Sequence, residues 1–433
     1  MNISPLHPWI NNKIGGMTLD EYRLDRIRRT IDHAKQNSAF YRKHLAGLAS
    51  SDIKRMDDIE LIPTMSSNDI AGNPGLLVCV PQSEISRIVT LDTSGTTGDP
   101  KRIYFTEDDL ELTVEFFMNG MKTLVGREDK VLILLPGEKF GSVGYVLREA
   151  LKRIGVFSEI HGVINDMDRC ITDIQRLGIN CVVGIPVQVL ELSYEANMKG
   201  IIGINSVLLS ADYVPEPVVE RIEENLGCTV YSHYGMTEMG FGGGVECSAF
   251  EGYHLRESDL FFEILDPDSG MALEDGLLGE VAFTTLNRRG MPLIRYRTGD
   301  ISRMIAGGCG CGSNLRRLDK IMGRKSDFIE LSPGIFISLP ELDEVIFKVR
   351  GIVNYKVKLY KGSYANAIKL MIKTSTEFTG ADQVKEKLME NIKIRAAAFR
   401  GQLIVMPVEF LDYVECSTGM VKRKIEILGE DRL

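Results

Sequence analysis

The alternation of apolar and polar positions divides the chain into segments of different texture. Residues 17–46 repeat apolar side chains at helical spacing behind a capping box formed by Thr18 and Glu21, which predicts an N-terminal helix. Between residues 131 and 231, short apolar strand-like runs alternate with amphipathic stretches of helical period. This alternation predicts βαβ units, in which helices cover a parallel sheet. Because ligands on such sheets bind beyond the carboxyl ends of the strands, we expect the turns after these strands to carry the chemistry.

The texture changes in the last third of the chain. Over residues 255–322, strand-like segments follow one another across short Gly, Pro or Asp turns, which predicts an antiparallel, barrel-like subdomain. Beyond the polar connector "GRKSD", strand and helix patterns predict a small α+β domain. We therefore expect an α/β fold with a large N-terminal domain, residues 1–325, that contains parallel helix-covered sheets and the antiparallel subdomain. A small, mobile α+β C-terminal domain, residues 326–433, follows it.

Composition excludes several classes of protein. The 433 residues include 51 Lys and Arg against 60 Asp and Glu, a net charge of −9 that argues against bulk binding of nucleic acid. No apolar run approaches the roughly 18 residues of a membrane span, and the first residues lack the basic and apolar regions of a signal peptide. Eight cysteines in so long a chain do not make a disulfide scaffold. We expect a cytoplasmic protein with neither a nucleic-acid nor a membrane partner.

The stretch "LDTSGTTGDPKR", residues 91–102, has the composition of a polyphosphate-binding loop. Its glycines allow close approach of backbone N–H groups, its hydroxyls add donors, and Lys101 with Arg102 adds positive charge. It is not a Walker loop, because Pro100 stands where that motif requires its second glycine. Strand-like flanks predict that the loop joins two strands, so that amides and side chains must hold the phosphates. A glycine-rich hairpin without a ligand is the alternative.

Two later stretches offer complementary chemistry. In "SHYGMTEMG", Tyr234 offers a ring for a purine, Thr237 a hydroxyl for a phosphate, and Glu238 a carboxylate suited to Mg²⁺. In "RYRTGD", Asp300 is suited to accept both hydroxyls of a ribose. The alternatives are a capped helix start for the first stretch and a plain turn for the second.

In this order, and with Gly-Arg before the final domain, the motifs resemble the adenylate-forming superfamily of acyl-CoA synthetases, adenylation domains and luciferases. The stretches "NSAFYRKHL", "LIPTMSSNDI", "GEVAFTTLNRRGMPLIRYRTGD" and "CGCG" narrow the resemblance to the phenylacetate-CoA ligase family, over nearly the whole chain. The resemblance implies an ATP-dependent, AMP-forming acid–thiol ligase that activates an aromatic or arylacetic acid as an acyl-adenylate and then forms a thioester with coenzyme A. We expect ATP, Mg²⁺, the acid and coenzyme A as ligands, and a homodimer as the assembly.

The resemblance also assigns roles to residues. It implies that Ser94, Thr96, Thr97 and Lys101 hold the β- and γ-phosphates, that Asp300 and Arg324 bind the ribose, and that Gly334 lines the pantetheine tunnel. The catalytic residues that it implies are Lys101, Thr237, Glu238, which also binds Mg²⁺, and Lys422. The nucleotide- and cofactor-binding residues that it implies are Ser94, Gly95, Thr96, Thr97, Gly98, Ser210, Ala211, Asp212, Tyr234, Gly235, Met236, Asp300, Arg324 and Gly334.

Two positions depart from the family pattern. Ser326 stands at the hinge, where relatives carry Asp or Lys, and Met420 stands where relatives place a catalytic lysine. Lys422 lies two residues on, about 7 Å away on the same face of a strand, and either replaces that lysine or forms a solvated basic strand end. These departures favour two alternative functions. One is an adenylylating synthetase of the deazaflavin-cofactor type that does not transfer to coenzyme A, and the other is a catalytically weakened relative that binds nucleotide or acyl-adenylate.

The cysteines contain a candidate metal site. Cys309 and Cys311 share a tight loop, and Cys247 and His254 lie together upstream, a Cys3His set suited to structural Zn²⁺. Free thiols are the alternative, because the long sequence gap between Cys247 and Cys309 does not establish that the two pairs meet in one site. The remaining cysteines lie in apolar text typical of packing residues: Cys79, Cys170, Cys181, Cys228 and Cys416.

The acid pocket is the least defined part of the site. Phe140, Tyr145, Phe241 and the glycines at 242–244 are predicted to shape it, and the small residues to leave room for a flat aryl ring. His233 either lines this pocket or is a structural histidine.

Overall fold

A computed structural model describes residues 3–91, 100–411 and 423–429, and its contacts divide the chain into two compact units. Unit 1 contains residues 1–129, 136–162 and 231–321. Unit 2 contains residues 130–135, 163–230 and 322–433. Among the described residues, no helix combines the length and the apolar character needed to cross a membrane.

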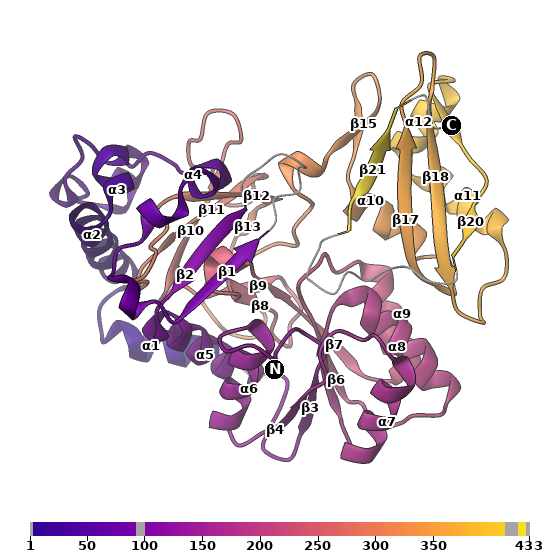
Figure 1. Cartoon of the computed structure of the whole chain (residues 1–433), viewed down its shortest axis with the longest axis horizontal. Helices are drawn as coiled ribbons and strands as arrows, with labels where there is room; N and C mark the ends of the chain where they lie inside the picture. The colour runs from indigo at the N-terminus through magenta and orange to yellow at the C-terminus, as the bar shows by residue number, and fades with distance from the viewer. Residues whose placement is uncertain (1–2, 92–99, 412–422, 430–433) are drawn as a thin grey trace. The chain divides into compact units, whose positions relative to one another are not determined.

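Unit 1 holds the N-terminal helices and most of the antiparallel strands (Figure 1). Its α-helices are α1 (Leu6–Ile14), α2 (Leu19–Asn37), α3 (Ala39–His44), α4 (Ser67–Gly72), α5 (Glu107–Met121) and α6 (Val143–Arg153). Its 3-10 turns are η1 (Ser50–Asp52), η2 (Met56–Leu61), η3 (Pro74–Leu77), η4 (Gln82–Glu84) and η5 (Thr237–Met239). Its strands are β1 (Arg87–Leu91), β2 (Lys101–Phe105), β4 (Phe157–Ile160), most of β7 (Thr229–Tyr234), β8 (Gly244–Val245), β9 (Tyr253–Leu255), β10 (Leu260–Leu265), β11 (Gly279–Thr285), β12 (Tyr296–Ser302), β13 (Met304–Ile305) and β14 (Arg317–Leu318).

The predicted N-terminal helix is broken into two. The capping box of Thr18 and Glu21 is present at the start of α2, as predicted. Ser38 is extended, with φ −114° and ψ 129°, and its hydroxyl accepts from the N–H of Tyr41, so that it ends α2 and begins α3. A serine that bonds to the backbone ahead of it competes with helix continuation, which accounts for the break.

The strands after residue 240 form the predicted antiparallel region. Strands β10, β11 and β12 make a three-stranded antiparallel sheet, with Phe262 opposite Phe283. A second antiparallel ladder runs β7-β8-β9-β14-β13 and brings His254 opposite Arg317. This ladder places residues 253–254 beside the segment that follows the "CGCG" loop.

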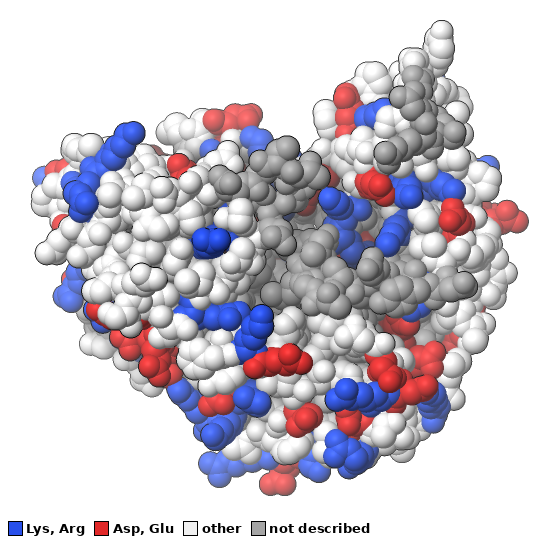
Figure 2. Space-filling model, in the orientation of Figure 1, with Lys and Arg blue, Asp and Glu red and all other residues white. Residues whose placement is uncertain are grey.

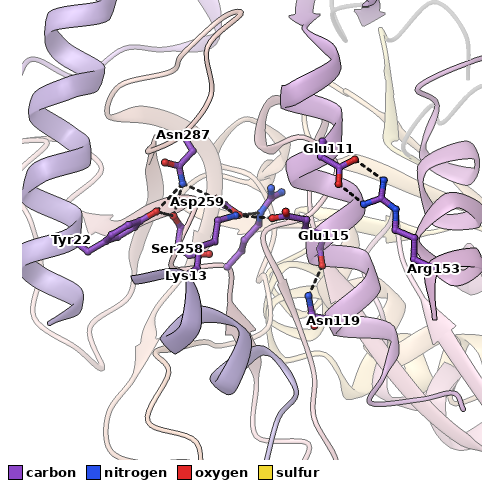
Figure 3. A network of polar contacts seen from close by, with 10 residues as sticks. Lys13, Tyr22, Glu111, Glu115, Asn119, Arg153, Ser258, Asp259 and Asn287 are labelled. Carbon is purple, nitrogen blue, oxygen red and sulfur yellow. Dashed lines mark hydrogen bonds and ion pairs between the residues drawn. The ribbon is translucent and has the colours of Figure 1, made fainter. Parts of the chain in front are cut away.

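A polar network ties the N-terminal helices to this region (Figure 3). Lys13 Nζ lies 2.9 Å from the Glu115 carboxylate of α5 and 3.0 Å from Asp259 Oδ1. Asn287 Nδ2 donates to Asp259 and to the hydroxyl of Tyr22, at 2.8 and 3.1 Å. Burial raises the pKa of Asp259, but Arg256 and Lys13 together hold it below its ordinary value. The network therefore attaches α1 and α2 to the antiparallel region through the ionised, buried carboxylate of Asp259.

Unit 2 contains the parallel strands and the C-terminal region (Figure 1). Strands β3, β5 and β6 are parallel neighbours in that order, with Val182 beside Val207, and each is apolar and mostly buried, as the βαβ pattern predicts. The elements of its first part are β3 (Lys130–Ile133), α7 (Met167–Leu177), β5 (Cys181–Gly184), α8 (Pro186–Met198), β6 (Ser206–Leu209) and α9 (Glu216–Leu226).

The C-terminal region is α+β, as predicted. Its long strands β17 and β18 pair antiparallel, and β21 pairs in parallel with β17. Its elements are η6 (Lys325–Asp327), β15 (Ile329–Ser332), β16 (Ile335–Ile337), α10 (Leu339–Ile346), β17 (Ile352–Tyr360), β18 (Asn366–Thr374), α11 (Ala381–Glu390), α12 (Ile392–Phe399), β19 (Leu403–Val405), β20 (Glu409–Phe410) and β21 (Ile425–Leu428). Apolar residues of this region and of the parallel part, among them Tyr355 and Leu190, belong to one buried cluster. The domain boundary at 325/326 and the mobility of the C-terminal domain stay predictions.

Candidate functional site

The predicted phosphate loop joins two antiparallel strands, as its flanks indicate. Strands β1 and β2 pair with Leu91 opposite Lys101, so Lys101 stands at the base of the loop. The loop residues Ser94, Gly95, Thr96, Thr97 and Gly98 lie outside the described residues, as do Met420 and Lys422. On the face drawn in Figure 2, the side chains of Lys and Arg intermingle with those of Asp and Glu.

Lys101 forms a buried ion pair with Glu238. Its Nζ donates to Glu238 Oε1 at 2.6 Å, and the two side chains are 13% and 3% exposed. The hydroxyl of Tyr296 donates to the same carboxylate oxygen at 3.3 Å. The pair joins a cation and a carboxylate from two motifs that lie 137 positions apart. A cation suited to phosphate oxygens is therefore in direct contact with a hard carboxylate suited to Mg²⁺.

The turn that carries Glu238 is fixed by its backbone. Thr237 and Glu238 lie in η5, and Met236 accepts from the N–H groups of Met239 and Phe241 at 3.0 and 2.9 Å. Gly235 must be glycine, since a Cβ there would lie 2.0 Å from the Phe241 carbonyl oxygen. The stretch forms one 3-10 turn ended by a left-handed glycine, which excludes the alternative of a helix start at this point.

Arg288 holds the same turn through the backbone of Glu238. Its Nη1 donates to the carbonyl of Glu238 at 2.7 Å, and its guanidinium lies 4.6 Å from the centre of the Phe105 ring. Burial lowers the pKa of Arg288 to about 10, which leaves it protonated at neutral pH. A third charge therefore stands next to the Lys101–Glu238 pair.

Tyr234 and Asp300 are brought together at the end of β7. The Tyr234 hydroxyl donates to Asp300 Oδ2 at 2.9 Å, and both side chains are buried. The Tyr234 ring lies 6.0 Å from the ring of Tyr253. Strand β12 carries Asp300 and also Tyr296, which contacts Glu238, so hydrogen bonds connect all three described motifs within unit 1.

Other predicted nucleotide residues lie in unit 2. Ser210, Ala211 and Asp212 follow the carboxyl end of β6, where ligands bind on parallel sheets, and Ala211 is left-handed with φ +73°. Arg324 immediately precedes η6. Gly334 occupies the turn between β15 and β16 with φ +76°, and a Cβ there would meet nothing within 4 Å. Backbone conformation, not crowding, accounts for glycine at this position.

The Cys3His residues form one buried cluster in unit 1. Cys247 Sγ lies 3.6 Å from Cys309 Sγ, and Cys311 Sγ lies 3.4 Å from His254 Nε2. All four ligand atoms lie within 4.8 Å of one another. Tetrahedral Zn²⁺ with Zn–S bonds of about 2.3 Å separates its sulfur ligands by about 3.8 Å. The donor set and its spacing therefore fit a closed structural zinc site.

The surroundings of the cluster suit metal-bound thiolates. The N–H groups of Ala249 and Cys311 donate to the sulfurs of Cys247 and Cys309, at 3.4 and 3.5 Å. Burial lowers the pKa of His254 to about 4, so the imidazole is neutral, the form that ligates metal. Among the described cysteines outside this set, Cys79, Cys170 and Cys181 are buried and Cys228 is half-buried.

The glycines predicted to shape the acid pocket pack closely against side chains of the protein. A Cβ on Gly242 would lie 2.5 Å from the Phe116 ring, and one on Gly243 would lie 2.8 Å from the sulfur of Met239. Glycine at these two positions therefore allows Phe116 and Met239 to pack against the backbone, and the room for an aryl ring stays a prediction. His233 is buried 5.7 Å from the Phe117 ring, and burial lowers its pKa to about 4.

The remaining predicted pocket residues are divided. Phe241 is buried and left-handed, with φ +68°, and its ring stacks 5.7 Å from that of Phe105. Phe140 is 46% exposed and contacts Tyr145 on α6, with 5.1 Å between ring centres.

Sequence reasoning missed Tyr296 and Arg288, which both contact Glu238. Tyr296 lies inside the "RYRTGD" motif, and the alternating burial of β12 puts it on the same face as Thr298 and Asp300. Period-two reading of that motif identifies Tyr296. Arg288 carries no local signal, since its role depends on a distant turn.

Comparison with known proteins found a matching family model and several similar chains. A family model described as "AMP-binding enzyme" matches residues 37–284. The phenylacetate-coenzyme A ligase of Pseudomonas putida is 27% identical over 383 residues, which cover 86% of this chain and 85% of the relative. A solved 2-hydroxyisobutyryl-CoA ligase in the postadenylation state, in complex with R3-HIB-AMP, is 21% identical and superposes with a TM-score of 0.79 over 94% of this chain and 89% of that one. The same ligase with 2-HIB-AMP and CoA in the thioesterification state is 21% identical and gives 0.68 over 97% and 92%. The predicted resemblance and fold class are confirmed.

Proposed function

This chain belongs to the AMP-binding enzyme family, and on that premise we propose that it ligates an aromatic or arylacetic acid to coenzyme A through an acyl-adenylate. The names of the curated relatives, phenylacetate-coenzyme A ligases that match over most of their length, support both the activity and the class of acid. The fold of a ligase solved with an acyl-adenylate and with CoA supports two half-reactions at one site.

In the first half-reaction, a carboxylate oxygen of the acid attacks the α-phosphorus of ATP, and the bond to pyrophosphate breaks. Lys101 and the hydroxyls of the 92–99 loop neutralise the charge that develops on the departing phosphates, and Thr237 donates to the α-phosphate. Glu238 would hold Mg²⁺, which supplies further charge neutralisation when bound. Tyr234 and the 210–212 segment frame the adenine, Asp300 accepts hydrogen bonds from the ribose hydroxyls, and Arg324 donates to the ribose.

In the second half-reaction, the thiol of coenzyme A attacks the acyl carbonyl carbon, and AMP leaves with the electron pair of the broken bond. The C-terminal domain, residues 326–433, turns about Ser326 between the two steps, and Gly334 lines the path of the thiol arm. Lys422 replaces the lysine missing at Met420 and bridges the α-phosphate and the carboxylate during adenylation.

The observation that carries the proposal is the buried contact of Lys101 with Glu238. The two residues belong to separate motifs and are expected to bind different parts of Mg·ATP, yet their side chains are in direct contact. A cation suited to phosphate oxygens and a carboxylate suited to Mg²⁺ therefore lie together, as a site for Mg·ATP requires.

Acid-dependent exchange of pyrophosphate into ATP tests the first half-reaction, and thioester formation with coenzyme A tests the second. We expect both with aryl or arylacetic acids, and weaker exchange with short aliphatic acids. Absence of exchange with every acid contradicts the ligase. Thioester formation only from supplied acyl-adenylate identifies the weakened relative, whereas an AMP conjugate formed without coenzyme A identifies the adenylylating alternative.

We also propose that Cys247, His254, Cys309 and Cys311 hold structural Zn²⁺. All four are protein ligands and all are buried, the closed arrangement of a structural site and not the open one of a catalytic site. A cytoplasmic location and a homodimeric assembly complete the proposal.

A further inference from the structure

The loop between β6 and α9, residues 210–215, has a strained backbone, and residues of the C-terminal region hydrogen-bond to it. Ala211 has φ +73°, a conformation that side-chain-bearing residues adopt only where the surroundings fix them. Asp212 Oδ1 accepts from the N–H of Tyr213 at 2.9 Å, which closes a local turn. Asp212 Oδ2 accepts from Arg423 Nε at 3.2 Å, so the distant end of the chain supplies the outer support.

Arg423 is itself fixed by residues of α10, its C-cap and β17 in the C-terminal region. Its Nη1 and Nη2 donate to the two oxygens of Asp343 on α10 at 2.9 and 2.8 Å, a fork-to-fork pair. The hydroxyl of Tyr355 on β17 donates to Asp343 at 2.5 Å. The rings of Phe347 and Tyr355 lie 5.6 Å from the guanidinium carbon. The guanidinium therefore has one orientation, in which Nε faces Asp212.

The burial of Asp343 makes its pairing with Arg423 necessary. The Asp343 side chain is fully buried, and burial raises the pKa of Asp343 to about 6, against the lowering effect of Arg423. A buried carboxylate without its cation is strongly unfavourable, so Arg423 stays on Asp343 whenever β21 is docked. The Asp212 contact follows as a consequence of that docking.

A neighbouring residue of α10 holds the other end of the loop. Glu344 Oε1 accepts from the hydroxyl of Tyr213 at 2.7 Å and from the N–H of Glu216, the first residue of α9, at 3.1 Å. A carboxylate at a helix N-terminus is favourable. Asp343 therefore holds one end of the loop through Arg423, and Glu344 holds the other end by direct hydrogen bonds.

We propose that Arg423 is a positioning residue for ATP: through Asp212 it holds the β6–α9 loop in the conformation that frames adenine, so that the nucleotide site is complete only when β21 is docked. This inference rests on the proposed function for the role of the loop. On this proposal Arg423 acts through Asp212 and not by direct contact with ATP. Nothing in the local sequence around Arg423 assigns it this role, because its partners lie 80 and 211 positions away.

The test measures the Kd for ATP by calorimetry without acid, in variants chosen to keep the fold. Arg423→Lys keeps a cation on Asp343 and lacks the fork that also reaches Asp212. The double variant Arg423→Met with Asp343→Asn removes both charges of the buried pair, a replacement that is often neutral for stability. We expect both to raise the Kd for ATP about tenfold or more, as for loss of a hydrogen bond to a charged group.

A double-mutant cycle with Asp212→Asn separates positioning from general stability. If Arg423 acts through Asp212, Asp212→Asn adds little to the effect of Arg423→Lys on ATP affinity. The matched control is Arg350→Met, which removes exposed ion pairs with Glu224 and Glu377 elsewhere in unit 2 and should leave the Kd unchanged.

Each outcome decides one claim. A folded Arg423→Lys protein with unchanged Kd for ATP, or additive effects in the cycle, overturns the positioning role and leaves the ligase standing. Wild-type protein that binds ATP but exchanges no pyrophosphate with any acid contradicts the proposed function, and the Arg423 comparison is still decided by the Kd. Wild-type protein that binds no ATP overturns both.

Discussion

The hydroxyl of Tyr234 donates to the carboxylate of Asp300 at 2.9 Å, in a buried contact between residues 66 positions apart. The carboxylate proposed to accept the ribose hydroxyls is therefore oriented before nucleotide arrives. Tyr234 then has two functions, a ring beside the adenine and a donor that fixes Asp300. A preoriented acceptor loses less entropy when ligand binds, so the contact contributes to affinity.

Replacement of Tyr234 by Phe separates these functions. The ring remains and the donor to Asp300 is lost, so we expect the KM for ATP to rise about tenfold, with about 1.5 kcal/mol lost for a hydrogen bond to a charged group. Asp300→Ala should weaken nucleotide binding more, in both half-reactions. Steady-state kinetics for ATP and for supplied acyl-adenylate measure both. An unchanged KM in either variant contradicts the ribose assignment.

Lys101→Ala should impair the use of ATP and also stability. The variant loses the cation proposed to hold the β- and γ-phosphates, and it leaves Glu238 buried without its partner, a loss of about 3–5 kcal/mol where a buried pair is broken. We expect a raised KM for ATP, a lower kcat for pyrophosphate exchange and a lower Tm.

Lys387→Ala is the control for this change. Lys387 pairs with Glu390 on the exposed face of α11, where a pair contributes little. Its kinetics and Tm should match those of the wild type. If Lys101→Ala retained wild-type kinetics for ATP, Lys101 would have no part in phosphate binding.

The sequence predicts a chemistry for each of these motifs, because each is a local pattern with its own residue types. It also predicted the capping box at Thr18 and the strands that flank the 92–99 loop. The contact of Lys101 with Glu238 was beyond local reading, since only the fold brings together residues 137 positions apart. The same limit applies to Gly242, whose close packing against Phe116 of α5 depends on the fold and not on the local sequence.

Zinc removal should destabilise unit 1. We expect about one zinc per chain by elemental analysis of the wild type, since all four proposed ligands lie within 4.8 Å of one another. Cys309→Ser should lose the metal and lower the Tm, because a structural zinc site contributes directly to folding free energy. Cys228→Ser, at a half-buried thiol outside the cluster, should keep the metal. Metal-free wild-type protein of full stability contradicts the site.

Acid should weaken the network that fixes the N-terminal helices. Arg256 and Lys13 hold the pKa of Asp259 below its ordinary value in the folded protein, despite the raising effect of burial. In the unfolded chain this pKa returns to about 3.9. A carboxyl with a depressed folded pKa contributes stability that is present above the unfolded value and is lost as the pH falls through the folded one. Stability from this group is therefore full at neutral pH and declines in acid.

Asp259→Asn tests this assignment through the pH dependence of the free energy of unfolding. The amide keeps the shape of the side chain but cannot titrate, so the variant should be less stable than the wild type at pH 7, and the difference should shrink as the pH falls below about 4. Urea unfolding at several pH values measures both slopes. Asp20→Asn is the control, because the Asp20 carboxylate is 67% exposed in its pair with Arg23 and should change neither curve much. A difference between Asp259→Asn and the wild type that stays constant into strong acid would place the effect in packing and not in charge.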